Sequence, residues 1–213
     1  MTINRLASYA AITAFAALVP FSFVASAQAA DGKVSHTFDL GGIENVVINN
    51  AVGEIKLRTI EGTEAQVTVE FEVKGRGFFR RKPDVSEQDI EIWQRGDTLS
   101  LGYKENNVNA VWTIRLPAVP AIELQQGVGA IDAVIGASNF IADLGVGDIK
   151  VTAPRDSAGQ VDVSSGVGAA RITGTDKVDS RRRVVSESAE ATLTGHAKIE
   201  ATVGVGDVEV KLR

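Results

Sequence analysis

Apolar and polar residues alternate with a period of two through most of the chain after residue 34, which is the pattern of half-buried β-strands. The clearest segments are AQVTVEFEV at 65–73, DIEIW at 89–93, TLSLGY at 98–103 and VWTIRLP at 111–117. No long stretch has the 3.6-residue period of an amphipathic helix. The pattern therefore predicts an all-β protein.

One eight-residue phrase occurs twice, as LGVGDIKV at 144–151 and as VGVGDVEV at 203–210. Its alternation changes phase in the middle, because Val146 and Ile149 are three residues apart instead of two. A straight strand cannot keep both side chains on one face, so the strand must bend between them. Glycine tolerates the positive φ that such a bend needs, and aspartate can bond to nearby backbone.

Relatives of this phrase recur along the second half of the chain. Its first glycine stands at Gly127, Gly145, Gly166 and Gly204, at steps of 18, 21 and 38 residues. An earlier relative is INNAVGEIKL at 48–57, and 185–195 is interpreted as a degenerate copy without the glycines. The expected turn residues of the repeat are Gly53, Gly129, Gly147, Asp148, Gly168, Gly206 and Asp207.

A period of about twenty residues with two short strands in each unit predicts a β-solenoid, in which each coil stacks on the next at about 4.8 Å. Val128, Val146, Val167 and Val205 are expected to form one inward ladder. An antiparallel meander or sandwich is the alternative, since it also has turns at regular spacing. Repetition of the whole phrase favours stacked coils.

Three segments resemble the bacterial putative-adhesin β-strand-repeat family of exported proteins: FDLGGIENVVINNAVGEIKL at 38–57, VWTIRLPAVPAIELQQGVGAI at 111–131, and the later GVGD phrases. Members of this family are mostly of unknown function. The resemblance implies a right-handed β-helical or solenoid fold and a location in the cell envelope. It implies no catalytic residues.

The N-terminal region has the layout of a secretory signal peptide over residues 1–29, with Arg5, an apolar run and a small-residue cleavage pattern that ends at Ala29. A retained membrane anchor is the alternative. The chain contains no cysteine, which excludes a lipid-attachment thiol and a disulfide framework. We expect one exported domain at 30–213, periplasmic or at the cell surface or secreted, with opening strands and a cap at 30–120 and coils at 121–213.

The sequence offers no pattern for a metal, a cofactor or a catalytic triad. The glycine phrases lack the third glycine of a dinucleotide loop, and their period is about twice that of calcium-binding nonapeptides. His36 and His196 are expected at the surface. The RGD tripeptide at 95–97 is interpreted as a hairpin turn. The formal net charge of −5 argues against nucleic-acid binding.

The basic and aromatic segment KGRGFFRRKP at 74–83 breaks the alternation. It could contact an anionic membrane surface or an envelope glycan. The favoured alternative is that its phenylalanines cover a sheet edge or an open end of the solenoid. The residues of this candidate contact loop are Arg76, Phe78, Phe79, Arg80, Arg81 and Lys82.

Taken together, these features predict an exported, non-enzymatic protein of the cell envelope with a structural, adhesive or binding role. Its expected partners are an envelope glycan, an anionic membrane surface or another protein. Weak self-association through the solenoid ends is also expected, with VEVKLR at 208–213 as one exposed edge. The alternative function is a glycan-binding or glycan-active module, which a row of acids with aromatics on one face would favour.

Overall fold

The computed structural model describes residues 32–73, 88–105 and 107–213, and every regular element in that part of the chain is a β-strand of one sheet. The all-β prediction is therefore confirmed. The strands are β1 (Lys33–Asp39), β2 (Asn45–Ile60), β3 (Glu64–Val73), β4 (Glu91–Arg95), β5 (Thr98–Tyr103), β6 (Val108–Pro117), β7 (Ala121–Val134), β8 (Asn139–Ala153), β9 (Ala158–Val167), β10 (Ala170–Thr173), β11 (Val178–Arg182), β12 (Glu187–Thr192), β13 (Ala197–Val205) and β14 (Val208–Leu212).

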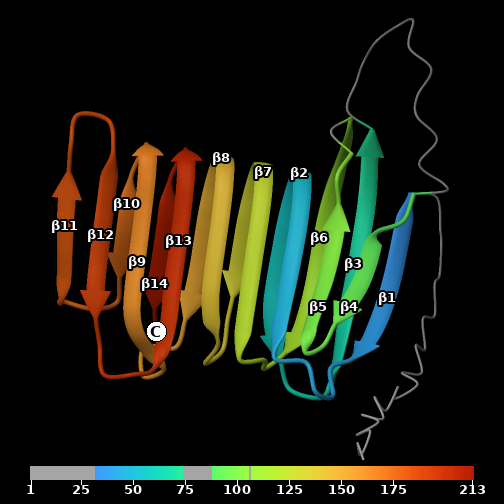
Figure 1. Ribbon diagram of the computed structural model, residues 1–213. Helices are drawn as coiled ribbons and strands as arrows, with labels where there is room; N and C mark the ends of the chain where they lie inside the picture. The colour runs from blue at the N-terminus through green and yellow to red at the C-terminus, as the bar shows by residue number, and fades with distance from the viewer. Residues whose placement is uncertain (1–31, 74–87, 106) are drawn as a thin grey trace, which may run out of the picture.

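The strands stand side by side in one long row (Figure 1). The order along the row is β1-β3-β6-β2-β7-β8-β13-β9-β12-β11, while β4, β5, β10 and β14 pair off this path. Neighbours from β6 to β9 are parallel, whereas β1 and β3 at one end and β12 and β11 at the other end pair antiparallel. The sheet is open, so β1 and β11 are end strands with one partner each.

Each copy of the glycine phrase divides its strand segment into a first arm before it and a second arm after it. In β7 the first arm buries Leu124 and Gln126, and the second arm buries Ile131 and Ala133. The four residues at 127–130 are not buried. The strand therefore bends around the outside of the core, as the change of phase in the sequence predicts. The strands β13 and β14, and also β9 and β10, are first and second arms joined by the same phrase.

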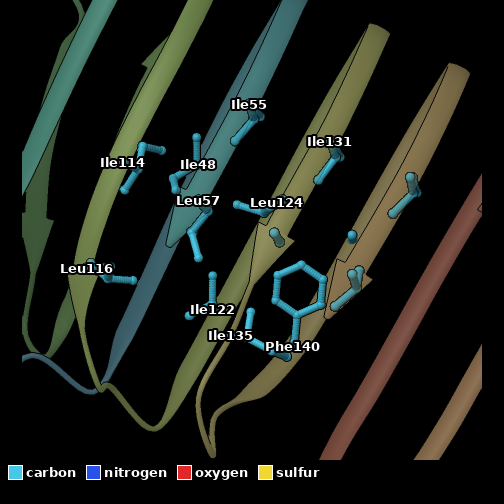
Figure 2. Close-up of a cluster of buried hydrophobic side chains, with 14 of the residues drawn as sticks. Ile48, Ile55, Leu57, Ile114, Leu116, Ile122, Leu124, Ile131, Ile135 and Phe140 are labelled. Carbon is cyan, nitrogen blue, oxygen red and sulfur yellow. The ribbon is translucent and has the colours of Figure 1, made fainter. Parts of the chain in front are cut away.

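The core lies on the inward side of both arms. Figure 2 shows Ile48 and Leu57, from the two arms of β2, gathering with Leu124 of β7 and Phe140 of β8. These side chains are fully buried, as is Trp112 on β6. Both arms face one apolar interior, so the bend lets a single sheet bury its own apolar face.

The glycines of the phrase stack in columns. Gly129 and Gly147 have φ values of 138° and 134°. A Cβ atom on Gly147 would lie 1.7 Å from the carbonyl oxygen of Gly129, and one on Gly129 would lie 1.7 Å from that of Gly53. The first glycine of the phrase is also crowded, because a Cβ atom on Gly145 would lie 2.5 Å from the carbonyl oxygen of Gly127. Any larger residue would collide with the backbone of the neighbouring strand, which explains why the phrase is repeated.

The spatial order of the phrases differs from their order in the chain. The last phrase begins at Gly204, and it lies between the phrases that begin at Gly145 and Gly166. Val205 pairs with Val146 on one side and with Val167 on the other. The C-terminal strand β14 consequently pairs with both β8 and β10, and it is not the exposed edge that we expected. The interpretation of 185–195 as a degenerate copy is wrong, because β12 pairs antiparallel with β9.

The expectation of an inward valine ladder is also wrong. Val128, Val146, Val205 and Val167 do lie on adjacent strands in register, but their exposed fractions are 45%, 47%, 48% and 49%. The reason is the bend, which carries the residues between the two buried arms around its outer side. We call these four residues, with the half-buried Val52 beside Val128, the valine row.

Candidate functional site

The outward sides of β4 and β5, of the first arms of β2, β7 and β8, and of β13 and β9 together form what we call the outer face, in which Ser100 and Gly102 on β5 are buried. Neighbouring strands place most of its residues in two rows, and a third row with the cations Arg95 and Lys198 lies beside them. One row is Trp93, Ser100, Val47, Glu123, Ile141, Glu200 and Asp162, and the other is Glu91, Gly102, Asn49, Gln125, Asp143, Thr202 and Ser164.

The aromatic member of the outer face is Trp93 on β4. Its side chain is 51% exposed, and it pairs across the strands with Ser100, which is buried. The strand β4 pairs only with β5 among the described strands, so Trp93 stands at the edge of the face. An exposed indole is unusual because burial of its large apolar ring is favourable, and it is typical of a contact surface.

Acidic side chains gather in the middle of the outer face. Burial raises the pKa of Asp143, and the negative charges of Glu200 and Glu123 raise it further. Glu200 forms an ion pair of 2.9 Å with Lys198, and Glu91 forms one of 2.8 Å with Lys104. The acids Glu123, Asp143 and Asp162 have no such ion pair with a described residue, so the face carries excess negative charge.

A groove of about 620 Å³ runs across the corner end of this face. Its length crosses β2, β7 and β8, and the chain after β5 forms one end. Its lining residues are Asn49, Asn50, Ala51, Tyr103, Lys104, Gln125, Gln126, Gly127, Asp143, Leu144 and Gly145. The small residues Ala51, Gly127 and Gly145 leave the strand backbone uncovered, while Gln125 and Asp143 supply hydrogen-bonding groups. The volume is in the range of small-molecule sites.

The valine row lies beyond the groove, and it is followed by the two acidic residues of the bends, Asp148 and Asp207. The Oδ1 atom of Asp148 accepts a hydrogen bond of 3.1 Å from the backbone N–H of Asp207, and the Oδ1 atom of Asp207 accepts one of 2.8 Å from that of Ala169. Each aspartate therefore ties its own bend to the bend of the next strand. In space the two aspartates are neighbours, although the copy of the phrase with Ala169 at this position separates them in the chain.

The outward side of the second arms has a different electrostatic pattern. The adjacent positions carry charges of alternating sign, in the order Lys56, Asp132, Lys150, Glu209 and Arg171. Opposite charges on neighbouring strands stabilise one register and disfavour a slipped one. In this row each acid lies between two cations, so its charges nearly cancel. The outer face, in contrast, carries more acidic than basic side chains.

A row of polar residues faces inward at the bend. The Nε2 atom of Gln126 donates a hydrogen bond of 2.8 Å to the carbonyl oxygen of Gly53, and the hydroxyl of Ser165 donates one of 2.7 Å to that of Gly206. Asn50 is 4% exposed, and among the described residues neither atom of its amide group has a hydrogen-bond partner. The same row continues with apolar Leu144 in β8.

The structure places the other sequence candidates as follows. The turn glycines Gly53, Gly129, Gly147, Gly168 and Gly206 all have positive φ at the bends. The RGD tripeptide is the turn between the antiparallel strands β4 and β5, as we expected. The expectation of a surface position is wrong for His36, which is 5% exposed and bonds to Asp89 at 2.8 Å, whereas His196 is exposed.

Two expectations fall on residues outside the part of the chain that the structure describes. These are the signal peptide at 1–29 and the contact loop with Arg76, Phe78, Phe79, Arg80, Arg81 and Lys82. Within the described ranges, no helix has the length and apolar character to cross a membrane.

The sequence alone did not predict that the residues of the outer face lie on one surface. Trp93, Asn49 and Asp143 are far apart in the chain, and they meet because β5, β2, β7 and β8 are neighbours. The alternation did mark each of them as an outward position of its strand. The order of the strands was the missing information.

Comparison with solved structures finds two bacterial proteins to which the chain is similar at low identity. A putative cell adhesion protein from Clostridium sporogenes ATCC 15579 is 15% identical, with a TM-score of 0.46, and the match covers 85% of this chain and 99% of that protein. A putative adhesin from Bacteroides fragilis NCTC 9343 is 10% identical, with a TM-score of 0.27, over 85% of this chain and 98% of that protein. No protein-family model matches the chain. No curated protein matches it either.

Proposed function

We propose that the protein is an exported, non-enzymatic binding protein of the cell envelope, with a structural or adhesive role. In this proposal the bent strands are coils of a right-handed β-solenoid, and the strands before residue 121 form its opening and cap. The in-register pairing of Gly53, Gly129 and Gly147, and of Val205 with Val146 and Val167 in the other copies, supports this interpretation of the fold.

The observation that carries the proposed function is the valine row. Five valines on five adjacent strands form an apolar ridge of about 19 Å at the strand spacing of about 4.8 Å. These side chains are nearly half exposed, so they keep apolar surface in contact with water, which is unfavourable. A partner that covers the ridge would remove this surface from water and be bound more stably. Glycines on both sides of Val128, Val146, Val167 and Val205, and on one side of Val52, leave the valines protruding from the backbone.

The test is retention of the full chain on isolated cell envelopes. Replacing Val128 and Val146 by serine removes the centre of the ridge from exposed positions, so the fold should persist. We expect at least a tenfold loss of sedimentation with the envelope fraction. The matched control replaces the exposed Val184 and Val185 by serine, and it should leave retention unchanged. Equal retention of all three proteins would refute the role of the valine row.

A second candidate function is a glycan-binding module on the same scaffold. The specific observation in its favour is the outer face, where Trp93 shares two rows with five carboxylates and the amides of Asn49 and Gln125. Amides and carboxylates bind hydroxyl groups, and aromatic rings pack against the apolar side of sugar rings. Incubating the purified chain with envelope polysaccharides and measuring new reducing ends separates binding from cleavage. The non-enzymatic proposal expects none to form.

A further inference from the structure

Trp93 provides a flat apolar platform at one end of the outer face. The other tryptophan, Trp112, is completely buried, whereas half of the Trp93 side chain is open to solvent. Glu91, two residues earlier on the same side of β4, points outward beside it and bonds to Lys104. A ring that packs on this indole would therefore have a carboxylate and an ammonium group close to its edge.

The polar side chains next to Trp93 repeat at the spacing of the strands. Asn49, Gln125 and Asp143 occupy equivalent positions on β2, β7 and β8. Neighbouring strands are about 4.8 Å apart, which is close to the length of one sugar ring in an extended chain. A glycan that runs across the strands would meet a new hydrogen-bonding side chain at each successive sugar. The groove follows the same line of residues.

The charge of the outer face selects among ligands. Partial burial raises the pKa of Asp143, and Glu200 and Glu123 raise it further, because three carboxylates lie close together on neighbouring strands. A bound cation relieves this repulsion, whereas a polyanion adds to it. Anionic polysaccharides, nucleic acids and anionic lipid surfaces are therefore disfavoured. A second copy of the same face is disfavoured for the same reason.

The backbone of the outer face favours a sugar chain over an extended peptide. Peptides that bind β-structure commonly add a strand at an edge, where backbone N–H and C=O groups are unpaired. Here β2, β7 and β8 each have hydrogen-bonded neighbours on both sides. On these three strands recognition therefore comes from side chains, which suits a chain of sugar rings that carry hydroxyl groups and amines.

We infer that the outer face binds a glycan strand whose sugars carry free amino groups. The strand crosses β4, β5, β2, β7 and β8, with one ring on Trp93 and its ammonium groups beside Glu123 and Asp143. This inference rests on the second candidate function and names the ligand class of that site.

The test titrates the full chain with a fully deacetylated glucosamine hexamer and with its fully N-acetylated counterpart, at equal length. Because Trp112 is buried, a change in tryptophan fluorescence reports contact at Trp93. We expect the amine form to bind at least tenfold more tightly than the acetylated form, and to weaken as salt rises. Replacing Trp93 by alanine removes this fluorescent reporter, so binding to that variant is measured by titration calorimetry, and its affinity for the amine form should be at least fivefold weaker than that of the wild type.

A charge-matched pair of variants tests the acids. Glu123→Gln with Asp143→Asn should remove the preference for the amine form. Glu61→Gln with Asp176→Asn makes the same change in charge at exposed positions away from the face, and it should keep the preference. Equal affinity of the wild type for both hexamers, or no binding of either, overturns the inference. Equally tight binding of a lysine hexapeptide also overturns it, because charge alone would then explain recognition. Envelope retention through the valine row is measured separately, so its outcome does not depend on these results.

Discussion

Replacing Gly147 by alanine tests the physical reason for the repeated phrase. The new Cβ atom would lie 1.7 Å from the carbonyl oxygen of Gly129, and ordinary contact begins near 3.4 Å. Strand β7 would therefore have to retreat by about 1.7 Å locally, which breaks two or three backbone hydrogen bonds at about 1–3 kcal/mol each. The φ of 134° adds about 1–2 kcal/mol of backbone strain for a residue with a side chain.

The expected loss is thus about 3–11 kcal/mol, which is comparable to the 5–15 kcal/mol that typically stabilises a domain. The control is Gly62→Ala, since Gly62 also has a positive φ, 122°, but no atom lies within 4 Å of its added Cβ. Only the strain of about 1–2 kcal/mol should appear there. Urea unfolding followed by circular dichroism measures both losses in the free energy of unfolding.

If the Gly147 variant does not fold, Gly145→Ala gives a milder form of the same collision, with the added Cβ at 2.5 Å from the carbonyl oxygen of Gly127. It should cost more than Gly62→Ala although Gly145 lacks a positive φ. The reasoning is refuted if either variant in the stacked phrase is as stable as the Gly62 control, since backbone crowding would then have no role.

Three further variants test the polar residues. Asn50→Leu should raise the free energy of unfolding by about 1–3 kcal/mol, because it removes a buried amide that has no partner among the described residues, and the same row already contains Leu144. A lower melting temperature would contradict this. Asp143→Asn should stabilise the fold at neutral pH, because the raised pKa means that ionised Asp143 opposes folding. The gain in stability should vanish as the pH falls below 3.8, the pKa of the carboxyl group in the unfolded chain, and a gain that persists in acid would contradict the electrostatic cause. Lys150→Glu should lower the free energy of unfolding by about 1 kcal/mol at low salt, since the new glutamate faces two acids on neighbouring strands, and 1 M NaCl should reduce this loss. The exposed Lys177→Glu is the control, and an equal loss of stability in both variants would refute the role of Lys150 in fixing the register.

The sequence by itself determined the local structure of this protein. The period of two at 65–73, 98–103 and 111–117 predicted strands that the structure contains, because alternation reflects which side of a strand is buried. The phase change between Val146 and Ile149 predicted a bend at the glycines, because geometry forbids a straight strand there. Both signals depend only on residues that are close in the chain.

Tertiary structure alone decided which side of the bend faces water and which strands are neighbours. The alternation around Val146 fits an inward or an outward corner equally well, and only the meeting of the two arms around one core places the valine outside. His36 lies on the same side of β1 as the buried Val34 and Phe38, and its hydrogen bond to Asp89 joins residues that are far apart in the chain. The outer face exists because β13 inserts between β8 and β9 and β5 docks on β2, which are pairings between distant segments. Local patterns carry no information about strand order, because any two strands of matching alternation form the same backbone hydrogen bonds.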